Sequence, residues 1–341
     1  MNSKYQTLHA HTLTSDGNMS YREVFENANT YGFGAIAFTD HDSLPNEEAL
    51  KYLDSQRSNE LKWIIGTEIS AGLPPESGGG HFSGLHVIGL FVDPRDKALL
   101  EHSRASIAER LERMKVLVTR LSDLGFEITE EACLKASGGE VIGKPHIVEA
   151  LKSFKKNEMV MKELVEKVRK QTESDTELKI KFDDMIASGE YQYPYRLFLS
   201  SDAMIKGVYY EGSYSIDLDA SVKMIRNAGG LAVIAHYFTA QQKITPDLLE
   251  VLLRDDRIDG IETTFGLWEY GTEKWDKMIT SMELTEKLAL KYNKIQTGGV
   301  DLHREEDFKK FVEVEPYAQR TIGMVEKVIE ISKVDTKWSS F

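Results

Sequence analysis

The residues best suited to chemistry in this chain are imidazoles and carboxylates at the ends of apolar segments. The stretch LHAHTLTSDG, Leu8 to Gly17, places His9 and His11 one residue apart. Other donors follow or end further apolar segments: His41, Glu68, His236, Asp301 and His303. The chain has only 9 histidines in 341 residues, so their concentration at such places indicates a shared role.

The elements that must position these donors alternate between strands and helices. Apolar strands are expected at 5–10, 35–39, 61–70, 85–93, 231–235, 258–263 and 294–303. Helical patterns lie between them, and Ser20 with Glu23 forms a capping-box pattern. This alternation predicts a parallel sheet or barrel. Because parallel strands present their C-terminal ends on one face, the donors are expected to meet there.

The donor types point to metal binding. Alternate residues of a strand share a side, so His9 and His11 can bind one ion together, and Asp301 with His303 repeats this spacing. Imidazole and carboxylate without thiolate suit Zn²⁺, Mn²⁺ or Fe²⁺ better than an all-oxygen Mg²⁺ or Ca²⁺ site. The number of candidates implies two or three ions, with Glu68 as a bridge. The alternative, ordinary polar residues at strand ends, is disfavoured because several separate segments agree.

His86 tests the strand directions, because it begins the strand expected at 85–93. In a wholly parallel arrangement it would lie on the far face. Either this strand runs antiparallel to 61–70, joined by the glycine-rich loop Ser77–Gly84, or His86 is not a ligand; the antiparallel arrangement is favoured. The loop lacks the Lys-Ser/Thr of a phosphate-binding P-loop, so no nucleotide role is assigned to it.

The middle of the chain, residues 97–199, is charged and helical. We expect it to be a helical insertion that closes over the active-site rim of a discontinuous barrel formed by residues 1–96 and 200–341. Its charge runs are interpreted as solvated helix faces.

Composition restricts the class of protein. A hydrophobic content of 41% and a charged content of 28% indicate a soluble globular protein without a membrane segment. The net charge of −13 disfavours a broad nucleic-acid surface but permits binding of a single phosphate at a metal site. The N-terminus lacks a signal-peptide pattern, and the single cysteine, Cys133, permits no internal disulfide, so we expect a cytoplasmic location and a structural role for Cys133.

The motifs LHAHTLTSDG, AFTDHD, GTEIS, LHVIGLFVD, GGLAVIAH and GVDLH occur in the order found in a known family. They resemble the motifs of the polymerase and histidinol phosphatase (PHP) family of metal-dependent phosphoesterases. The resemblance implies a distorted, seven-stranded TIM-like (β/α) barrel with a trinuclear metal site on its C-terminal rim. The ligands that it implies are His9, His11, Asp16, His41, Glu68, His86, His236, Asp301 and His303. It is the only ground for including Asp16, and Asp40 is expected to support a ligand rather than to be one.

The insertion contains VIGKPHIVEALK, Val141 to Lys152. This segment resembles one in the subgroup that includes nucleoside 3′,5′-bisphosphate phosphatases and a 5′→3′ exoribonuclease. The resemblance implies that Lys144 and His146 contact substrate phosphate. Lys144 stands where the subgroup usually has arginine, and it lacks a bidentate fork. The alternative for His146 is a local hydrogen bond at a helix start, and Arg196 is expected to be a packed or surface arginine that could also reach a phosphate.

The resulting prediction is a metal-dependent phosphomonoesterase or phosphodiesterase, a phosphoric ester hydrolase that uses water activated by the metal ions. The expected substrates are small phosphorylated molecules, namely nucleoside 3′,5′-bisphosphates or short RNA ends. His146 or a water would protonate the leaving oxygen. Alternatives are a phosphatase of histidinol phosphate, an amide or lactone hydrolase at the same metal cluster, and a non-catalytic binding module stabilised by metal.

Overall fold

The computed structural model describes residues 4–78, 83–138, 141–210, 212–266, 275–313, 318–332 and 338–341. The chain divides into two compact units. The first combines Met1–Ser106 with Tyr214–Phe341, and the second is Ile107–Ser213.

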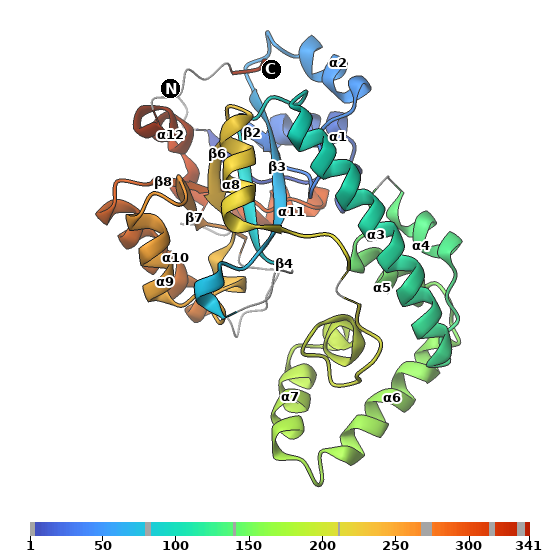
Figure 1. Cartoon of the computed structure of the whole chain (residues 1–341). Coiled ribbons are helices and arrows are strands. Elements are labelled where there is room, and N and C mark those ends of the chain that lie inside the picture. Colours follow the sequence, from blue (N-terminus) through green and yellow to red (C-terminus); the bar gives the residue numbers. More distant parts are fainter. Residues whose placement is uncertain are drawn as a thin grey trace. The chain divides into compact units, whose positions relative to one another are not determined.

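The first unit is built on a closed sheet (Figure 1). Its main path runs in the order β1 (Tyr5–Thr7), β2 (Phe33–Phe38), β3 (Lys62–Gly72), β4 (Ser83–Leu90), β6 (Leu231–Ile234), β7 (Gly260–Thr264) and β8 (Ile295–Gly298). A short β5 (Ile216–Asp217) pairs with the end of β3. A parallel bridge between Ala10 and Leu302 and a hydrogen bond from Leu8 N to Gly298 O join the two ends of the path. The expected distorted seven-stranded barrel is therefore confirmed.

The distortion comes from β4, which pairs antiparallel with both β3 and β6. The antiparallel arrangement favoured from the position of His86 is thus confirmed, and His86 pairs with Ser70 near the C-terminal end of β3. Residues 79–82 of the glycine-rich loop lie outside the described residues. One strand boundary was wrong. β1 ends at Thr7, and the two histidines flank the isolated bridge at Ala10.

Helices cover the outside of the barrel (Figure 1). α1 (Tyr21–Thr30) packs on β2, α8 (Leu218–Asn227) on β4, α10 (Trp275–Lys291) on β7 and α12 (Met324–Ser332) on β8. The remaining helices of the unit are α2 (Glu47–Ser55), α9 (Pro246–Arg254) and α11 (Glu305–Glu313). The expected capping box is confirmed, because Glu23 N donates to Ser20 Oγ and Ser20 N donates to Glu23. α11 and α12 were not anticipated from the sequence.

The second unit is helical and has its own hydrophobic core. α3 (Lys97–Asp123) begins in the first unit and continues into the second, followed by α4 (Glu130–Ser137), α5 (Lys144–Lys152), α6 (Asn157–Gln171), α7 (Thr176–Ala187) and a π-helical segment at Tyr195–Leu199. Cys133 is buried in this core with Phe126 and Phe198. The division falls after residues 106 and 213, whereas the sequence analysis placed it after 96 and 199, because a continuous helix crosses the first boundary. Within the described ranges, no helix has the length and apolar character needed to cross a membrane.

Candidate metal centre

The nine residues that the sequence analysis nominated as ligands meet in one cluster of the first unit. Their donor atoms form four overlapping groups, each with all donors within 4.8 Å of one another. The groups are His11 with Asp16, His41 and His303; His9 with His236 and Asp301; His9 with His11 and Glu68; and His41 with Glu68 and His86. Because the groups share members, the arrangement resembles a multinuclear site more than a single ion site.

Glu68 lies at the centre of the cluster and is fully buried. Its Oε1 lies 2.9 Å from His86 Nδ1 and 3.0 Å from His236 Nε2. Its Oε2 lies within 3.3 Å of nitrogens from three further rings, those of His9, His11 and His41. A carboxylate with both oxygens facing several donors is suited to bridge two ions.

The two histidines of the opening motif face each other. His9 Nε2 and His11 Nε2 are 3.1 Å apart, and Asp301 Oδ1 lies 3.3 Å from both. The i, i+2 argument therefore places these two rings correctly. The second pair also converges, because Asp301 Oδ1 lies 3.9 Å from His303 Nδ1, although the two residues belong to different donor groups. Asp301 has φ = 51°, so this pair comes together without regular strand alternation.

Several donor atoms of the cluster lack hydrogen bonds. Within the described residues, Asp16 Oδ1, His41 Nδ1, Glu68 Oε2 and Asp301 Oδ1 are buried and make none. Asp16 Oδ1 nevertheless lies 3.6 Å from His11 Nδ1 and 3.5 Å from His303 Nε2. Burying an acceptor without a partner is costly. Atoms that converge without bonding to one another are the arrangement expected for ligands of cations placed between them.

The backbone is strained at three places in or beside the cluster. Asp42, His236 and Asp301 have φ values of 48°, 24° and 51°. A left-handed conformation of a residue other than glycine costs about 1–3 kcal/mol and concentrates at functional sites. The strain therefore supports a functional role for this end of the barrel.

The pKa values show how strongly the charges interact. Burial raises the pKa of Glu68, but the positive charges of nearby rings, His41 foremost, hold it well below its usual value. Burial lowers the pKa of His9, but carboxylates, Asp301 foremost, raise it well above its usual value. Burial and the His303 charge lower the pKa of His11, but the nearby carboxylates of Asp301 and Glu68 raise it to about 9. The buried carboxylates thus require positive charge beside them, either as protons on the rings or as metal cations in their place.

Asp40, expected to support a ligand, organises the loop that carries Asp16. Its carboxylate accepts hydrogen bonds from Thr12 N at 2.7 Å, Ser15 Oγ at 2.7 Å and Tyr21 OH at 2.6 Å. Ser15 Oγ also lies 3.4 Å from His11 Nδ1. Asp40 therefore acts on the cluster through the loop rather than by touching a ring.

A second carboxylate, Asp42, ties down the segment after His41. Its Oδ1 accepts from Ser70 N at 2.8 Å and lies 3.1 Å from His102 Nε2. His102 Nδ1 in turn lies 2.9 Å from Tyr214 OH. The sequence analysis did not identify this chain of contacts, because residues 42, 70, 102 and 214 share no local pattern.

Glu262 on β7 is a further buried carboxylate that the sequence analysis missed. Its Oε1 lies 3.0 Å from His9 Nδ1, and its Oε2 accepts from His236 N at 2.7 Å. The available signal was a glutamate within the apolar strand segment IDGIET.

The residues expected to bind phosphate lie in the second unit. Gly143 N donates to His146 Nδ1 at 3.0 Å, which is the local hydrogen bond considered as the alternative for His146. Lys144 Nζ lies 4.9 Å from the centre of the Tyr209 ring. Arg196 Nη2 donates to Asp184 Oδ2 at 2.8 Å, as a surface arginine can.

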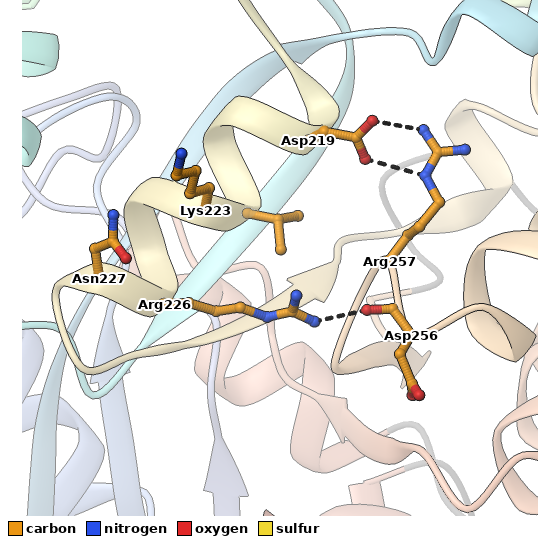
Figure 2. Close-up of a pocket in the computed structure, with 7 residues that line it drawn as sticks. Asp219, Lys223, Arg226, Asn227, Asp256 and Arg257 are labelled. Atoms are coloured by element: carbon orange, nitrogen blue, oxygen red, sulfur yellow. Dashed lines mark hydrogen bonds and ion pairs between the residues drawn. The ribbon is translucent and has the colours of Figure 1, made fainter.

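A hollow of about 330 Å³ is lined by residues of α8 and of the segment before β7, and none of them belongs to a donor group (Figure 2). Arg226 and Arg257 line it, but Arg257 pairs bidentately with Asp219, and Arg226 donates to Asp256 O at 2.9 Å. Arg226 also contacts Asp259, whose Oδ2 accepts from Ala232 N at the start of β6. The hollow therefore runs along α8, and its arginines already have acidic partners.

The sequence of this chain is similar to a known protein family and to several of its characterised relatives. The model of the PHP domain family matches residues 7–248 of this chain. A phosphoribosyl 1,2-cyclic phosphate 1,2-diphosphodiesterase of Eggerthella lenta is 25% identical over 301 residues, which cover 87% of this chain and 94% of that protein. A 3′,5′-nucleoside bisphosphate phosphatase of Chromobacterium violaceum is 27% identical over 145 residues, 42% of this chain and 48% of that protein. The chain thus matches about half the length of the second relative and nearly all of the first.

Among solved structures, a protein of Bifidobacterium adolescentis described as a metal-dependent phosphoesterase has a TM-score of 0.63. The match covers 96% of each chain at 20% sequence identity. At this identity the likeness establishes a shared fold.

The Asp40 network makes a prediction about stability. Replacing Tyr21 by phenylalanine removes a hydroxyl that donates to a buried carboxylate, so the free energy of unfolding should fall by about 1.5–3 kcal/mol. Urea unfolding of the chelator-treated protein measures the change. Tyr31→Phe is the matched control, because that half-buried ring stacks on Phe308, and its effect should stay within about 0.5 kcal/mol. Equal effects of the two variants would contradict a stabilising role for the network.

Proposed function

The chain belongs to the PHP domain family, and from this membership we propose that it is a metal-dependent phosphoesterase acting on a small phosphorylated substrate. The observation that carries the proposal is the cluster of nine imidazole and carboxylate residues with converging, unbonded oxygens. The donor set fits divalent Zn, Mn or Fe, because it combines nitrogen and oxygen ligands without thiolate. The overlapping groups have room for two or three ions.

The proposed ligands have distinct tasks. Glu68 joins the groups, since its two oxygens face rings of different groups. Bound ions would supply Lewis-acid activation of the phosphoryl group and would lower the pKa of a water nucleophile toward about 7. The three carboxylates Asp16, Glu68 and Asp301 only partly neutralise two or three divalent ions. The remaining positive charge would attract a phosphate in spite of the acidic net charge of the chain.

The proposed substrates are nucleoside 3′,5′-bisphosphates or short RNA ends, which makes the reaction a phosphoric ester hydrolysis. Support comes from the bisphosphatase relative and from the position of Lys144 at the first turn of α5. The buried ring of His146 has its Nδ1 occupied by Gly143 N, so its Nε2 is the atom able to donate to a phosphate or a leaving oxygen. Arg196, paired with Asp184, is the weaker candidate.

A second candidate is hydrolysis of a cyclic phosphate on a phosphoribosyl compound. The observation that favours it is the match to the diphosphodiesterase, which extends over 94% of that protein, whereas the bisphosphatase matches over about half. Both candidates place phosphate on a sugar. A nucleoside bisphosphate is hydrolysed at a monoester bond, whereas the cyclic phosphate and the RNA chain are hydrolysed at a diester bond.

A phosphate-release panel tests the function. The purified protein with added Mn²⁺, Zn²⁺ or Fe²⁺ is offered nucleoside 3′,5′-bisphosphates, short 5′-phosphorylated RNA, a phosphoribosyl cyclic phosphate, mononucleotides and histidinol phosphate. Phosphate is measured for the monoesters, and chromatography follows the nucleotide released from RNA or the ring-opened monoester formed from the cyclic phosphate. We expect turnover of a substrate of one of the first three classes and loss of activity with chelator. Tight metal binding without turnover of any phosphoester would instead support a binding module, and turnover of a phosphate-free amide or lactone would support another hydrolase.

Removing a proposed ligand tests the metal centre. His9→Ala and Asp301→Ala should each lower the metal content and reduce turnover by more than about 100-fold, beyond the effect usual for an outer partner. Metal content is measured by elemental analysis after dialysis. Glu250→Ala is the control, because this partly exposed carboxylate on α9 pairs with Lys291 and lies outside the four donor groups, and its metal content should be unchanged. Wild-type metal stoichiometry in both ligand variants would refute the assignment.

Lys144→Ala tests phosphate positioning. It should raise KM for a bisphosphate about 10-fold, the value of one ionic hydrogen bond, with little change in kcat. Lys152→Ala, which removes the same charge from the last turn of α5, serves as the control and should leave KM unaltered. A fall in kcat alone on every substrate would contradict a positioning role.

A further inference from the structure

Glu262 makes two contacts that belong to two different segments of the donor cluster. Its side chain is fully buried in β7. One oxygen meets the ring of His9, 253 residues away in the chain, and the other meets the backbone of His236. Both oxygens are thus engaged, and Glu262 is not a member of any of the donor groups found within the described residues.

The contact with His9 sets the orientation of that ring. Because a carboxylate oxygen accepts, His9 Nδ1 carries the proton of the 3.0 Å hydrogen bond to Glu262 Oε1. His9 Nε2 is then the nitrogen left for a metal ion, and it faces the cluster, 3.1 Å from His11 Nε2 and 3.3 Å from Asp301 Oδ1. A hydrogen bond at one ring nitrogen fixes which nitrogen can bind a metal.

The contact with His236 holds a strained backbone. His236 has φ = 24° and ψ = 58°, and its N–H donates to Glu262 Oε2 at 2.7 Å. This conformation directs the ring back into the cluster, where Nε2 lies 3.0 Å from Glu68 Oε1. Without an acceptor at this place, the buried N–H of His236 would have no partner. The strained turn after β6 would then lose the hydrogen bond that stabilises it.

The two contacts converge on one donor group. His9 and His236 are both members of the group completed by Asp301, and His9 is shared with the group of His11 and Glu68. The side-chain contacts found for Glu262 within the described residues reach no member of the group formed by His11, Asp16, His41 and His303. That other group is supported from the opposite side by Asp40, through Ser15 and Thr12. We propose that Glu262 is a positioning residue that pre-organises the His9–His236–Asp301 metal position selectively. This inference rests on the proposed function, since it presumes that the cluster binds metal.

Glu262→Gln is the direct test. Glutamine has the shape of glutamate but carries one oxygen and one NH₂ group, so only one of the two contacts can be kept and the NH₂ faces a donor. Calorimetric titration of the chelator-treated full chain with Mn²⁺ should show one metal position weakened about 10- to 100-fold. The remaining positions should keep wild-type affinity. Activity should recover at high Mn²⁺ concentration, because the variant has lost only metal affinity at one position.

Thr297→Val is the matched control. Thr297 pairs with Glu262 across β7 and β8, is buried, and its hydroxyl makes no hydrogen bond within the described residues. Valine has the same shape, so this variant perturbs the same layer of the barrel without touching the cluster and should bind Mn²⁺ as the wild type does. Glu262→Asp, which keeps both acceptor oxygens on a shorter side chain, should regain part of the lost affinity.

The outcomes separate the inference from the proposed function. If the wild type binds no Mn²⁺, Zn²⁺ or Fe²⁺, the metal centre itself is refuted and the inference falls with it. If the wild type binds metal and Glu262→Gln has the same affinity at every position, only the positioning role is refuted. Equal weakening of all positions, or failure of Glu262→Gln and Glu262→Asp to fold while Thr297→Val folds, would show a general structural role and overturn the claim of selectivity.

Discussion

The constraint on which the structure depends is the burial of Glu68. A carboxylate removed from water needs compensating positive charge, and its loss of hydration is expensive. Here the compensation comes from rings delivered by five separate histidines, at 2.9–3.3 Å. The closed barrel brings these rings together because β2, β3 and β6 end on the same side and β4 begins there. The barrel therefore serves mainly to gather charge that a local segment could not supply.

Two further carboxylates, Asp40 and Glu262, complete this arrangement. Neither is a member of the donor groups found within the described residues. Asp40 holds the loop carrying Asp16 through three hydroxyl and backbone donors. Glu262 holds His9 and the strained turn at His236. The donor atoms themselves make few hydrogen bonds, so their positions depend on these outer contacts.

The order of apolar and polar residues was sufficient to predict those parts of the site that follow from the periodicity and direction of the strands. His9 and His11 meet because alternate residues share a side, and the reversal of β4 follows from the place of His86. Asp16 lies in a loop without periodicity, and only family resemblance identified it. Glu262 was missed because a glutamate in a strand is usually a solvent-facing residue, and only closure of the barrel shows that it points inward. The left-handed backbone at Asp301 likewise has no signature in the local sequence, so it was not foreseen.

The contact between His102 and Tyr214 has a consequence for how such a protein can change. The chain leaves the first unit after Ser106 and returns at Tyr214, and the two side chains beside these junctions are in contact at 2.9 Å. An inserted segment whose two ends are in contact constrains the barrel little, because the entropic cost of closing the inserted loop rises only slowly with its length. About a hundred residues can therefore be altered, shortened or exchanged while the barrel and its charge cluster keep their connections. The barrel and the helical unit can therefore change independently of each other in evolution.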